Sequence, residues 1–179
     1  MFINIELKAR CRDPNRVRGI LTNEGADYKG RDHQVDVYFN VLHGRLKLRK
    51  GNIENSLIGY HREDIAGSKQ SNVYIFTTVP GTPLEEILTT TLGVKVIVDK
   101  QRDIYFIRNV KFHVDEVQGL GSFVEVEAID LEGNIGRERL QQQCNQYKAM
   151  LGIRDEDLLA KSYSDLLLEV QSHRKRFGS

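Results

Sequence analysis

Alternation of polar and apolar residues dominates the sequence, beginning with residues 2–10. Asn4, Glu6 and Lys8 fall on one face of this segment and apolar side chains fall on the other, which is the two-residue period of a β-strand. Similar patterns predict further strands over residues 34–40, 45–49, 56–62, 72–79, 94–100, 103–107, 111–117 and 122–129. The pattern as a whole therefore predicts about eight short strands.

Helical segments flank these strands. Asp13 is placed as the N-cap of a helix with Pro14 at its first position, and Gly25 ends that helix. Further helices are predicted over residues 83–92 and from about residue 136 onward, with a break near Gly152. Strands segregated from helices indicate an α+β fold, and many short strands in a small domain tend to close on themselves. We therefore expect a single domain, residues 1–179, built on a closed antiparallel eight-stranded β-tunnel with flanking helices.

Composition and charge exclude several classes of function. The net charge is only +1, so no field of the whole molecule directs it to nucleic acid or to an anionic membrane. The two cysteines, Cys11 and Cys144, lie far apart and have no neighbours at ligand spacing, which argues against a zinc site or a disulfide framework. The alternation from Asn4 onward matches neither a signal peptide nor a membrane span. We expect a cytoplasmic protein, with neither nucleic acid nor membrane as partner.

The polar faces of the predicted strands carry both signs of charge at high density. The charged positions that share these faces are Glu6, Lys8, Arg10, Arg45, Lys47, Arg49, Lys100, Arg102, Lys111, His113, Asp115, Glu125 and Glu127. One interpretation is a solvated sheet surface. The other is a barrel interior, which needs the charges to pair with one another or with an ionic ligand. Carboxylates that hold a divalent metal and Arg or Lys side chains that bind phosphate are the complement for a metal–polyphosphate complex. Periodicity alone leaves both interpretations open.

Five motifs in order carry a family resemblance. Asn4-Ile5-Glu6-Leu7-Lys8 stands where a Glu-x-Glu-x-Lys strand is the family hallmark. The other segments are Gly44 to Arg49, Lys100 to Tyr105, Asp115 to Glu127, and Lys161 to Leu167. At these residues the chain resembles the CYTH family, or triphosphate tunnel metalloenzymes, which groups class IV adenylyl cyclases, thiamine triphosphatases and inorganic triphosphatases. The likeness runs from Asn4 to Leu167 and is greatest to the class IV cyclase branch.

The resemblance implies a role for each charged position. The implied metal ligands are Glu6, Glu125 and Glu127, and Asp115 either joins them or orients a cation. The implied phosphate binders are Lys8, Arg49, Lys100 and Arg102, with Arg45, Lys47 and Arg62 as helpers; of these, Lys8, Lys100 and Arg102 are taken as catalytic. The implied cofactor is Mg²⁺ or Mn²⁺.

Two positions depart from the family pattern, and several residues have a plainer interpretation. Asn4 replaces the first Glu of the hallmark, and His61 stands where many relatives carry Lys. His113 is interpreted as a satisfied interior histidine, and Tyr163 as a helix-packing residue. The basic run Ser172 to Arg176 is interpreted as a solvated tail.

The expected function is therefore a metal-dependent reaction of a triphosphate. The first hypothesis is conversion of ATP to cyclic AMP and pyrophosphate, and the second is hydrolysis of inorganic, thiamine or nucleoside triphosphate. Because Asn4 removes a charge, a non-catalytic nucleotide- or polyphosphate-binding module stays open. A nucleic-acid binder is disfavoured, since aromatic residues are not interleaved with the basic ones. The oligomeric state, a homodimer included, stays open.

Overall fold

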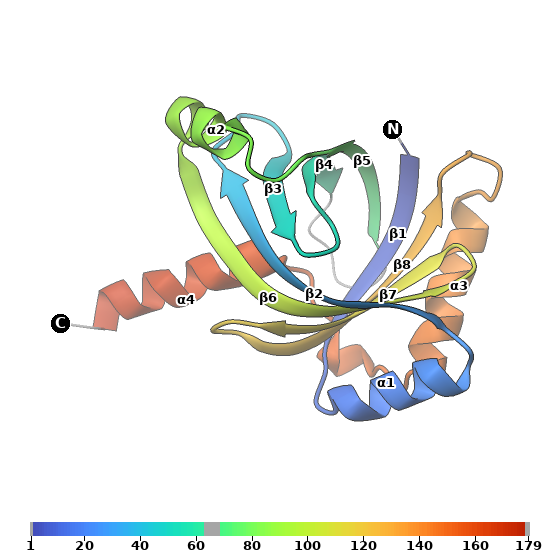
Figure 1. Ribbon diagram of the computed structural model, residues 1–179. Helices are drawn as coiled ribbons and strands as arrows, with labels where there is room; N and C mark the ends of the chain where they lie inside the picture. Colours follow the sequence, from blue (N-terminus) through green and yellow to red (C-terminus); the bar gives the residue numbers. More distant parts are fainter. Residues whose placement is uncertain (1, 63–68, 178–179) are drawn as a thin grey trace.

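Eight antiparallel strands form a closed barrel in the computed structural model, which describes residues 2–62 and 69–177 (Figure 1). The strands are β1 Phe2–Arg10, β2 Asp27–Phe39, β3 Arg45–Gly51, β4 Ser56–Arg62, β5 Lys69–Thr77, β6 Val94–Ile107, β7 Val110–Val117 and β8 Gly121–Asp130. Around the barrel they follow the order β1-β5-β4-β3-β2-β6-β7-β8, and the pairing of β1 with both β5 and β8 closes it. The predicted closed antiparallel eight-stranded architecture is confirmed.

The strand β6 corrects one detail of the sequence prediction. Residues 94–100 and 103–107, predicted as two strands, form one strand because β6 pairs with β2 along its whole length. Lys100 and Arg102 therefore lie in the middle of a strand rather than near its end. Strand β2 is also longer than predicted and begins at Asp27, with an irregular register between Tyr28 and Gly30.

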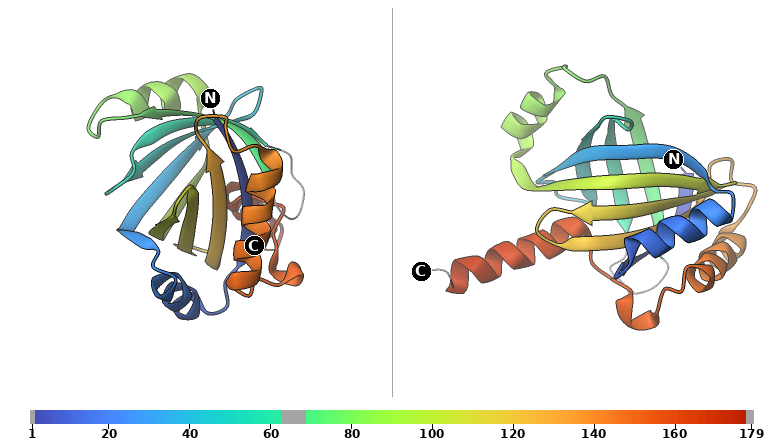
Figure 2. Two further views of the ribbon diagram at one scale, coloured as in Figure 1. Left: turned by 90° about the vertical axis from the view of Figure 1, so that its right-hand side faces the viewer. Right: turned by 60° about the horizontal axis from the view of Figure 1, so that its bottom comes forward.

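The described part of the chain forms four α-helices, which lie on the outside of the barrel. They are α1 Pro14–Asn23, α2 Leu84–Leu92, α3 Arg137–Met150 and α4 Tyr163–Phe177, with a short 3-10 helix at Asp155–Asp157. Asp13 caps α1 as predicted, because its side chain accepts a hydrogen bond from the backbone N–H of Arg16. The helix α4 begins against the barrel and projects away from it toward the C-terminus (Figure 2). The basic run predicted as a tail thus lies in the last turns of α4, where residues 171–176 are exposed.

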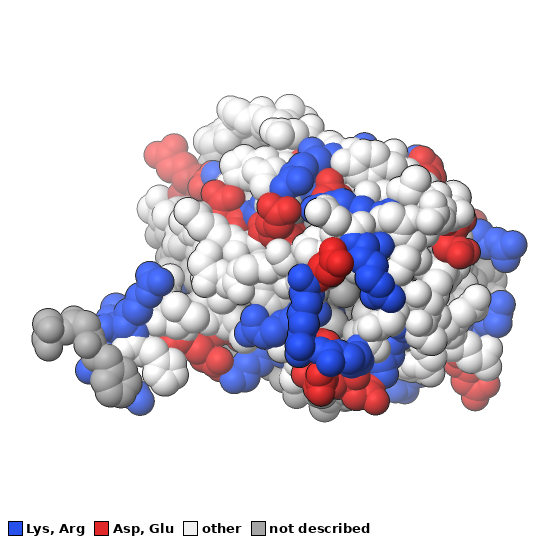
Figure 3. All heavy atoms as spheres, turned by 90° about the horizontal axis from the view of Figure 1, so that it is seen from below, with Lys and Arg blue, Asp and Glu red and all other residues white. Residues whose placement is uncertain are grey.

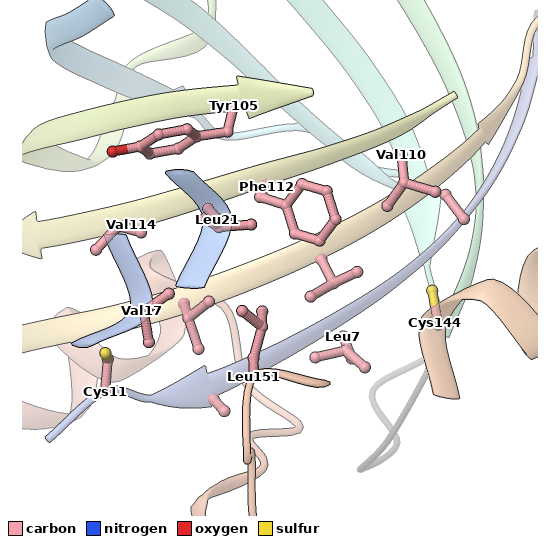
Figure 4. Packing of buried hydrophobic residues seen from close by; sticks show 14 of the residues in the cluster. Leu7, Cys11, Val17, Leu21, Tyr105, Val110, Phe112, Val114, Cys144 and Leu151 are labelled. Carbon is pink, nitrogen blue, oxygen red and sulfur yellow. The ribbon is translucent and has the colours of Figure 1, made fainter. Parts of the chain in front are cut away.

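The main apolar core lies outside the barrel wall. The outward side chains of β1, β7 and β8 pack against α1 and α3; Val17 and Leu21 of α1, for example, lie beside Phe112 and Val114 of β7 (Figure 4). All four of these side chains are buried, and Leu21, Phe112 and Val114 have no exposed surface. The helices thus bury the outer faces of these strands, and their inner faces remain available for polar side chains.

Several charged side chains on the outer surface pair with opposite charges. On the underside of the molecule, Lys and Arg side chains lie beside Asp and Glu side chains (Figure 3). Arg18 contacts both Asp103 and Glu116, and Arg31 also contacts Glu116. In the part of the chain that the structure describes, no helix is long and apolar enough to cross a membrane.

The packing of α1 leads to a prediction about stability. Leu21→Ala should lower the free energy of unfolding by about 2–5 kcal/mol, because it leaves a cavity between α1 and the barrel. Urea denaturation measures the change. The control is Ile97→Ala on β6, where the side chain is 51% exposed and little should change. Equal effects of the two substitutions would contradict the placement of the core.

Candidate functional site

A cavity of about 410 Å³ occupies the barrel, and all eight strands contribute side chains to its wall. Its charged lining residues are Glu6, Lys8, Asp36, Lys47, Arg49, Glu54, Lys100, Arg102, Lys111, Glu125 and Glu127. Glu6, Lys100 and Glu125 come from three different strands and face this one space. The interpretation of the charged strand faces as a barrel interior is therefore confirmed.

One group of cations gathers around Asp36 on β2. The Lys47 and Lys100 ammonium nitrogens lie 2.9 and 2.7 Å from Asp36 Oδ2. Arg49 donates from Nε to Oδ1 at 2.9 Å and from Nη2 to Oδ2 at 3.0 Å. Burial alone would raise the pKa of Asp36, but these three cations hold it well below its ordinary value. Asp36 thus remains ionised and holds three cations close together, two from β3 and one from β6.

A second group of ion pairs surrounds Arg102 on β6. Arg102 donates to Asp115 Oδ1 and to Glu125 Oε2, each at 2.7 Å. Lys8 lies 2.9 Å from Glu125 Oε1. Asp115 has no exposed surface, and its Oδ2 also accepts a hydrogen bond of 2.7 Å from the Tyr163 hydroxyl. Of the two roles expected for Asp115, these contacts favour orientation of Arg102, and metal binding stays a prediction.

The oxygens of Glu125 are likewise engaged. Besides Lys8 and Arg102, Glu125 contacts His113, whose Nδ1 lies 2.9 Å from Glu125 Oε2. Burial and the charge of Arg102 outweigh this hydrogen bond and lower the pKa of His113 to about 4, so the imidazole is neutral at pH 7. The other ring nitrogen, Nε2, is buried without a hydrogen-bond partner among the described residues. Only one of the two ring nitrogens of His113 is therefore hydrogen-bonded, whereas the sequence interpretation expected a fully hydrogen-bonded interior histidine. Glu125 thus anchors two cations, and its expected role as a metal ligand stays a prediction.

Asn4, Glu6 and Glu127 form the oxygen-rich part of the cavity. Asn4 donates from Nδ2 to Glu127, and Asn4 Oδ1 is buried without a hydrogen-bond partner among the described residues. Glu6 and Glu127 are register partners on β1 and β8. Burial raises the pKa of Glu127, and the nearby negative charge of Glu6 raises it further. Two carboxylates held close together beside a buried amide oxygen form a site that a cation would stabilise.

This donor set fits a metal of the magnesium type. In residues 2–62 and 69–177, no three His, Cys, Asp or Glu side chains converge as a complete metal site. Mg²⁺ does not require one, since it is commonly held by one or two carboxylates together with water and substrate phosphates. Glu6 and Glu127 supply the carboxylates and Asn4 Oδ1 supplies a neutral hard oxygen, so the replacement of Glu by Asn at position 4 preserves a donor.

Three further predicted positions lie differently from expectation. Arg45, expected to help bind phosphate, does not line the cavity; its Nη2 lies 3.1 Å from Asp165 of α4. The side chain of Arg62 lies outside the described residues. Tyr163 is more than a packing residue, since it lines the cavity and its ring centroid lies 3.9 Å from the Lys8 ammonium.

Sequence reasoning gave no role to three residues that the structure brings into the site. Asp36 falls on the alternating polar face of its strand, and that pattern could have indicated it. Lys111 was placed on a charged face, and it pairs with Glu54. Glu54 also accepts a hydrogen bond of 3.0 Å from Arg49. It lies in the loop between β3 and β4, where no periodic pattern indicates its direction.

Comparison with known proteins agrees with this geometry. Residues 3–163 match the CYTH domain. The chain belongs to the CYTH family. A relative from Methanocaldococcus jannaschii, named provisionally as an adenylate cyclase, is 25% identical over 176 residues, which cover 92% of this chain and 98% of the relative.

Solved structures share the fold. The PH1012 protein of Pyrococcus horikoshii superposes with a TM-score of 0.75 at 25% identity, over 91% of this chain and 98% of that one. A protein from Hippeastrum, named for adenylyl cyclase and described as having a dominant triphosphatase activity, has a TM-score of 0.60 at 12% identity, over 96% of each chain. At that identity the second likeness shows the fold alone.

The contacts of Asp36 lead to a prediction about stability with and without ligand. Asp36→Asn should lower the free energy of unfolding by about 3–5 kcal/mol, because it leaves Lys47, Arg49 and Lys100 crowded without their counter-charge. Inorganic triphosphate should restore part of this loss, since the anion would replace the missing charge. Denaturant titration with and without triphosphate measures both effects.

The matched control is Asp99→Asn, which removes a carboxylate that is 40% exposed and paired with His33. It should change stability by less than about 1 kcal/mol. An Asp36→Asn protein as stable as this control would show that Asp36 does not hold the cations together.

Proposed function

We propose that this CYTH protein is a metal-dependent enzyme that binds a triphosphate in its barrel, and that its reaction is that of a class IV adenylyl cyclase. The observation that carries the proposal is the arrangement of the cavity, in which ion-paired Lys and Arg side chains and the Glu6–Glu127 pair face one space. The name of the Methanocaldococcus jannaschii relative supports the cyclase reaction. The described activity of the Hippeastrum protein supports a triphosphatase as the second candidate.

The lysines and arginines would bind the phosphates. A triphosphate carries about four negative charges, so its enzyme acts mainly by positioning and by charge stabilisation. Lys8, Lys47, Arg49, Lys100 and Arg102 all line the cavity, and each is already held by a carboxylate. Pre-arranged in this way, the cations lose little freedom when the substrate binds.

Glu6, Glu127 and Asn4 Oδ1 would hold Mg²⁺ or Mn²⁺. When bound, the metal ion would supply positive charge to the phosphate oxygens. The chain's own contribution is to place the two carboxylates opposite each other on β1 and β8. The charge of Lys111 lowers the pKa of Glu127, but burial and Glu6 raise it, and the pKa is raised overall. His61, which replaces a lysine of the family pattern, is exposed and does not line the cavity.

The same set of side chains could serve either reaction. In the cyclase reaction the ribose 3′-hydroxyl attacks the α-phosphorus and pyrophosphate leaves. In the hydrolase reaction water attacks the terminal phosphorus and orthophosphate leaves. The two differ in which phosphorus Arg102 and the neighbouring lysines hold in line with the nucleophile.

We expect the protein to act in the cytoplasm, without nucleic acid or membrane as partner. Both cysteines are buried free thiols, as a reducing compartment permits.

Product identification tests the proposed function. The protein is incubated with ATP, inorganic triphosphate or thiamine triphosphate, each with Mg²⁺, Mn²⁺ or EDTA. Cyclic AMP with pyrophosphate supports the cyclase, and orthophosphate alone supports the triphosphatase. If the protein binds these triphosphates but forms no product in any metal condition, the proposal that it is an enzyme is wrong and the non-catalytic binding module is favoured.

Removal of Glu127 tests the metal site. Glu127→Gln should raise the metal concentration needed for half-maximal activity by at least about tenfold. Without ligand its melting temperature should be unchanged or higher, because an acid whose pKa is raised on folding destabilises the folded state when it is ionised at pH 7. Exposed Glu138→Gln is the control. An unchanged metal requirement would remove Glu127 from the site.

Arg102 and Arg45 distinguish cations inside and outside the cavity. Arg102→Lys keeps the charge but loses the paired hydrogen bonds to Asp115, and should lose activity by about tenfold to a hundredfold. Arg45→Lys should cost far less, because Arg45 contacts α4 instead of the cavity. Steady-state kinetics of both variants measure the difference. Comparable losses would contradict the assignment of Arg102 to the cavity and Arg45 to the outside.

Lys100 gives the site a pH dependence. Burial lowers its pKa to about 7, with Arg49, Arg102 and Lys47 adding to the effect and Asp36 opposing it. A bound triphosphate stabilises the charged form, so substrate affinity should fall as the pH rises above about 7 and the free enzyme loses this charge. The slope of KM against pH from 7 to 9 should flatten in Lys100→Arg, which stays protonated, and persist in the exposed control Lys95→Arg. The same slope in all three proteins would contradict this assignment.

A further inference from the structure

The wall of the cavity is unevenly charged. Six strands, β1, β2, β3, β6, β7 and β8, each present charged side chains to it. The adjacent strands β4 and β5 present only uncharged ones between residues 56 and 60 and between residues 71 and 77. These are Ser56, Ile58, Tyr60, Ser71, Val73, Ile75 and Thr77, which we call the uncharged wall.

The aliphatic residues of the uncharged wall are neighbours. Ile58 and Ile75 are register partners on β4 and β5, and Val73 is the partner of Tyr60. On its other side, Ile58 is the partner of Lys47 on β3, one of the cations held by Asp36. An apolar surface therefore lies directly beside the proposed phosphate-binding cations.

These aliphatic side chains lie apart from the main apolar clusters of the protein. The clusters of buried apolar residues include none of Ile58, Val73 and Ile75. Ile58 and Val73 are only 8% and 7% exposed, whereas Ile75 is 52% exposed although it points into the cavity. A triphosphate chain would gain nothing from contact with this surface, but an organic group attached to the chain would bury it.

The chemistry of the wall also limits which organic group fits. A neutral heteroaromatic base can stack against aliphatic side chains and Tyr60. The hydroxyl groups of Ser56 and Thr77 lie on the same wall and can bond to the base or to the sugar.

We propose that the uncharged wall binds the base and sugar of a nucleoside triphosphate, and that inorganic triphosphate is a poor substrate because it leaves this wall in contact with water. This inference rests on the proposed function. It assigns Ile58, Val73 and Ile75 to the recognition of the nucleoside part of the substrate.

Ile75→Ser, with Ile97→Ser as a matched control, tests the inference. Both isoleucines lie in strands and are about equally exposed, at 52% and 51%, but Ile97 does not line the cavity. We would measure kcat and KM with ATP and with inorganic triphosphate, and the binding of each by calorimetry. Wild type should prefer ATP in kcat/KM by at least about tenfold. Ile75→Ser should raise KM and the dissociation constant for ATP by about threefold to tenfold and leave both unchanged for inorganic triphosphate.

The outcomes separate the inference from the function on which it rests. Ile97→Ser should behave as wild type with both compounds. If wild type uses inorganic triphosphate as well as ATP, or if Ile75→Ser weakens both compounds equally, the uncharged wall does not select the substrate although the triphosphate function stands. If wild type neither binds nor converts either compound, the proposed function itself is wrong.

Discussion

The ion pair network around Asp36 is the constraint on which the site depends. Charged side chains inside a protein are costly unless each has a counter-charge and hydrogen bonds. Asp36 provides both to Lys47, Arg49 and Lys100, while Asp115 and Glu125 do the same for Arg102. The cavity can therefore hold many cations without a substrate, and under the proposed function these cations would bind the phosphate oxygens.

The fold tolerates the energetic cost of this buried charge because its apolar core lies outside the barrel. The helices α1 and α3 cover the outer faces of β1, β7 and β8, and the side chains packed there supply the hydrophobic stabilisation that a barrel usually obtains from its interior. Each of these strands thus has an apolar outer face and a charged inner face. A single two-residue period in the sequence serves both the stability of the fold and the chemistry of the site.

Charge is arranged for different tasks in different parts of the cavity. In the Asp36 and Arg102 groups each cation contacts a carboxylate, and the Asp36 group has three cations around one carboxylate. Glu6 and Glu127, in contrast, form a like-charge pair with too little compensation, as the raised pKa of Glu127 indicates. The first arrangement is suited to a polyanion and the second to a metal ion. Ile58 and Ile75 complete the wall with a surface that neither phosphate nor metal would use.

The sequence by itself determined the strands, the α+β class and the set of charged faces, because a two-residue period is a local property of the chain. Residues quoted from the family motifs, such as Lys8, Lys100 and Arg102, were also visible there. Only the tertiary structure decided that β6 is one strand, that Arg45 contacts α4 and that Tyr163 joins the site. It also decided which carboxylates form ion pairs: Asp115 and Glu125 both pair with Arg102. Glu54, which pairs with Arg49, reaches the cavity from a loop that has no periodic pattern. Pairing between residues far apart in the sequence depends on how the barrel closes and on the register of its strands, and no local pattern specifies either.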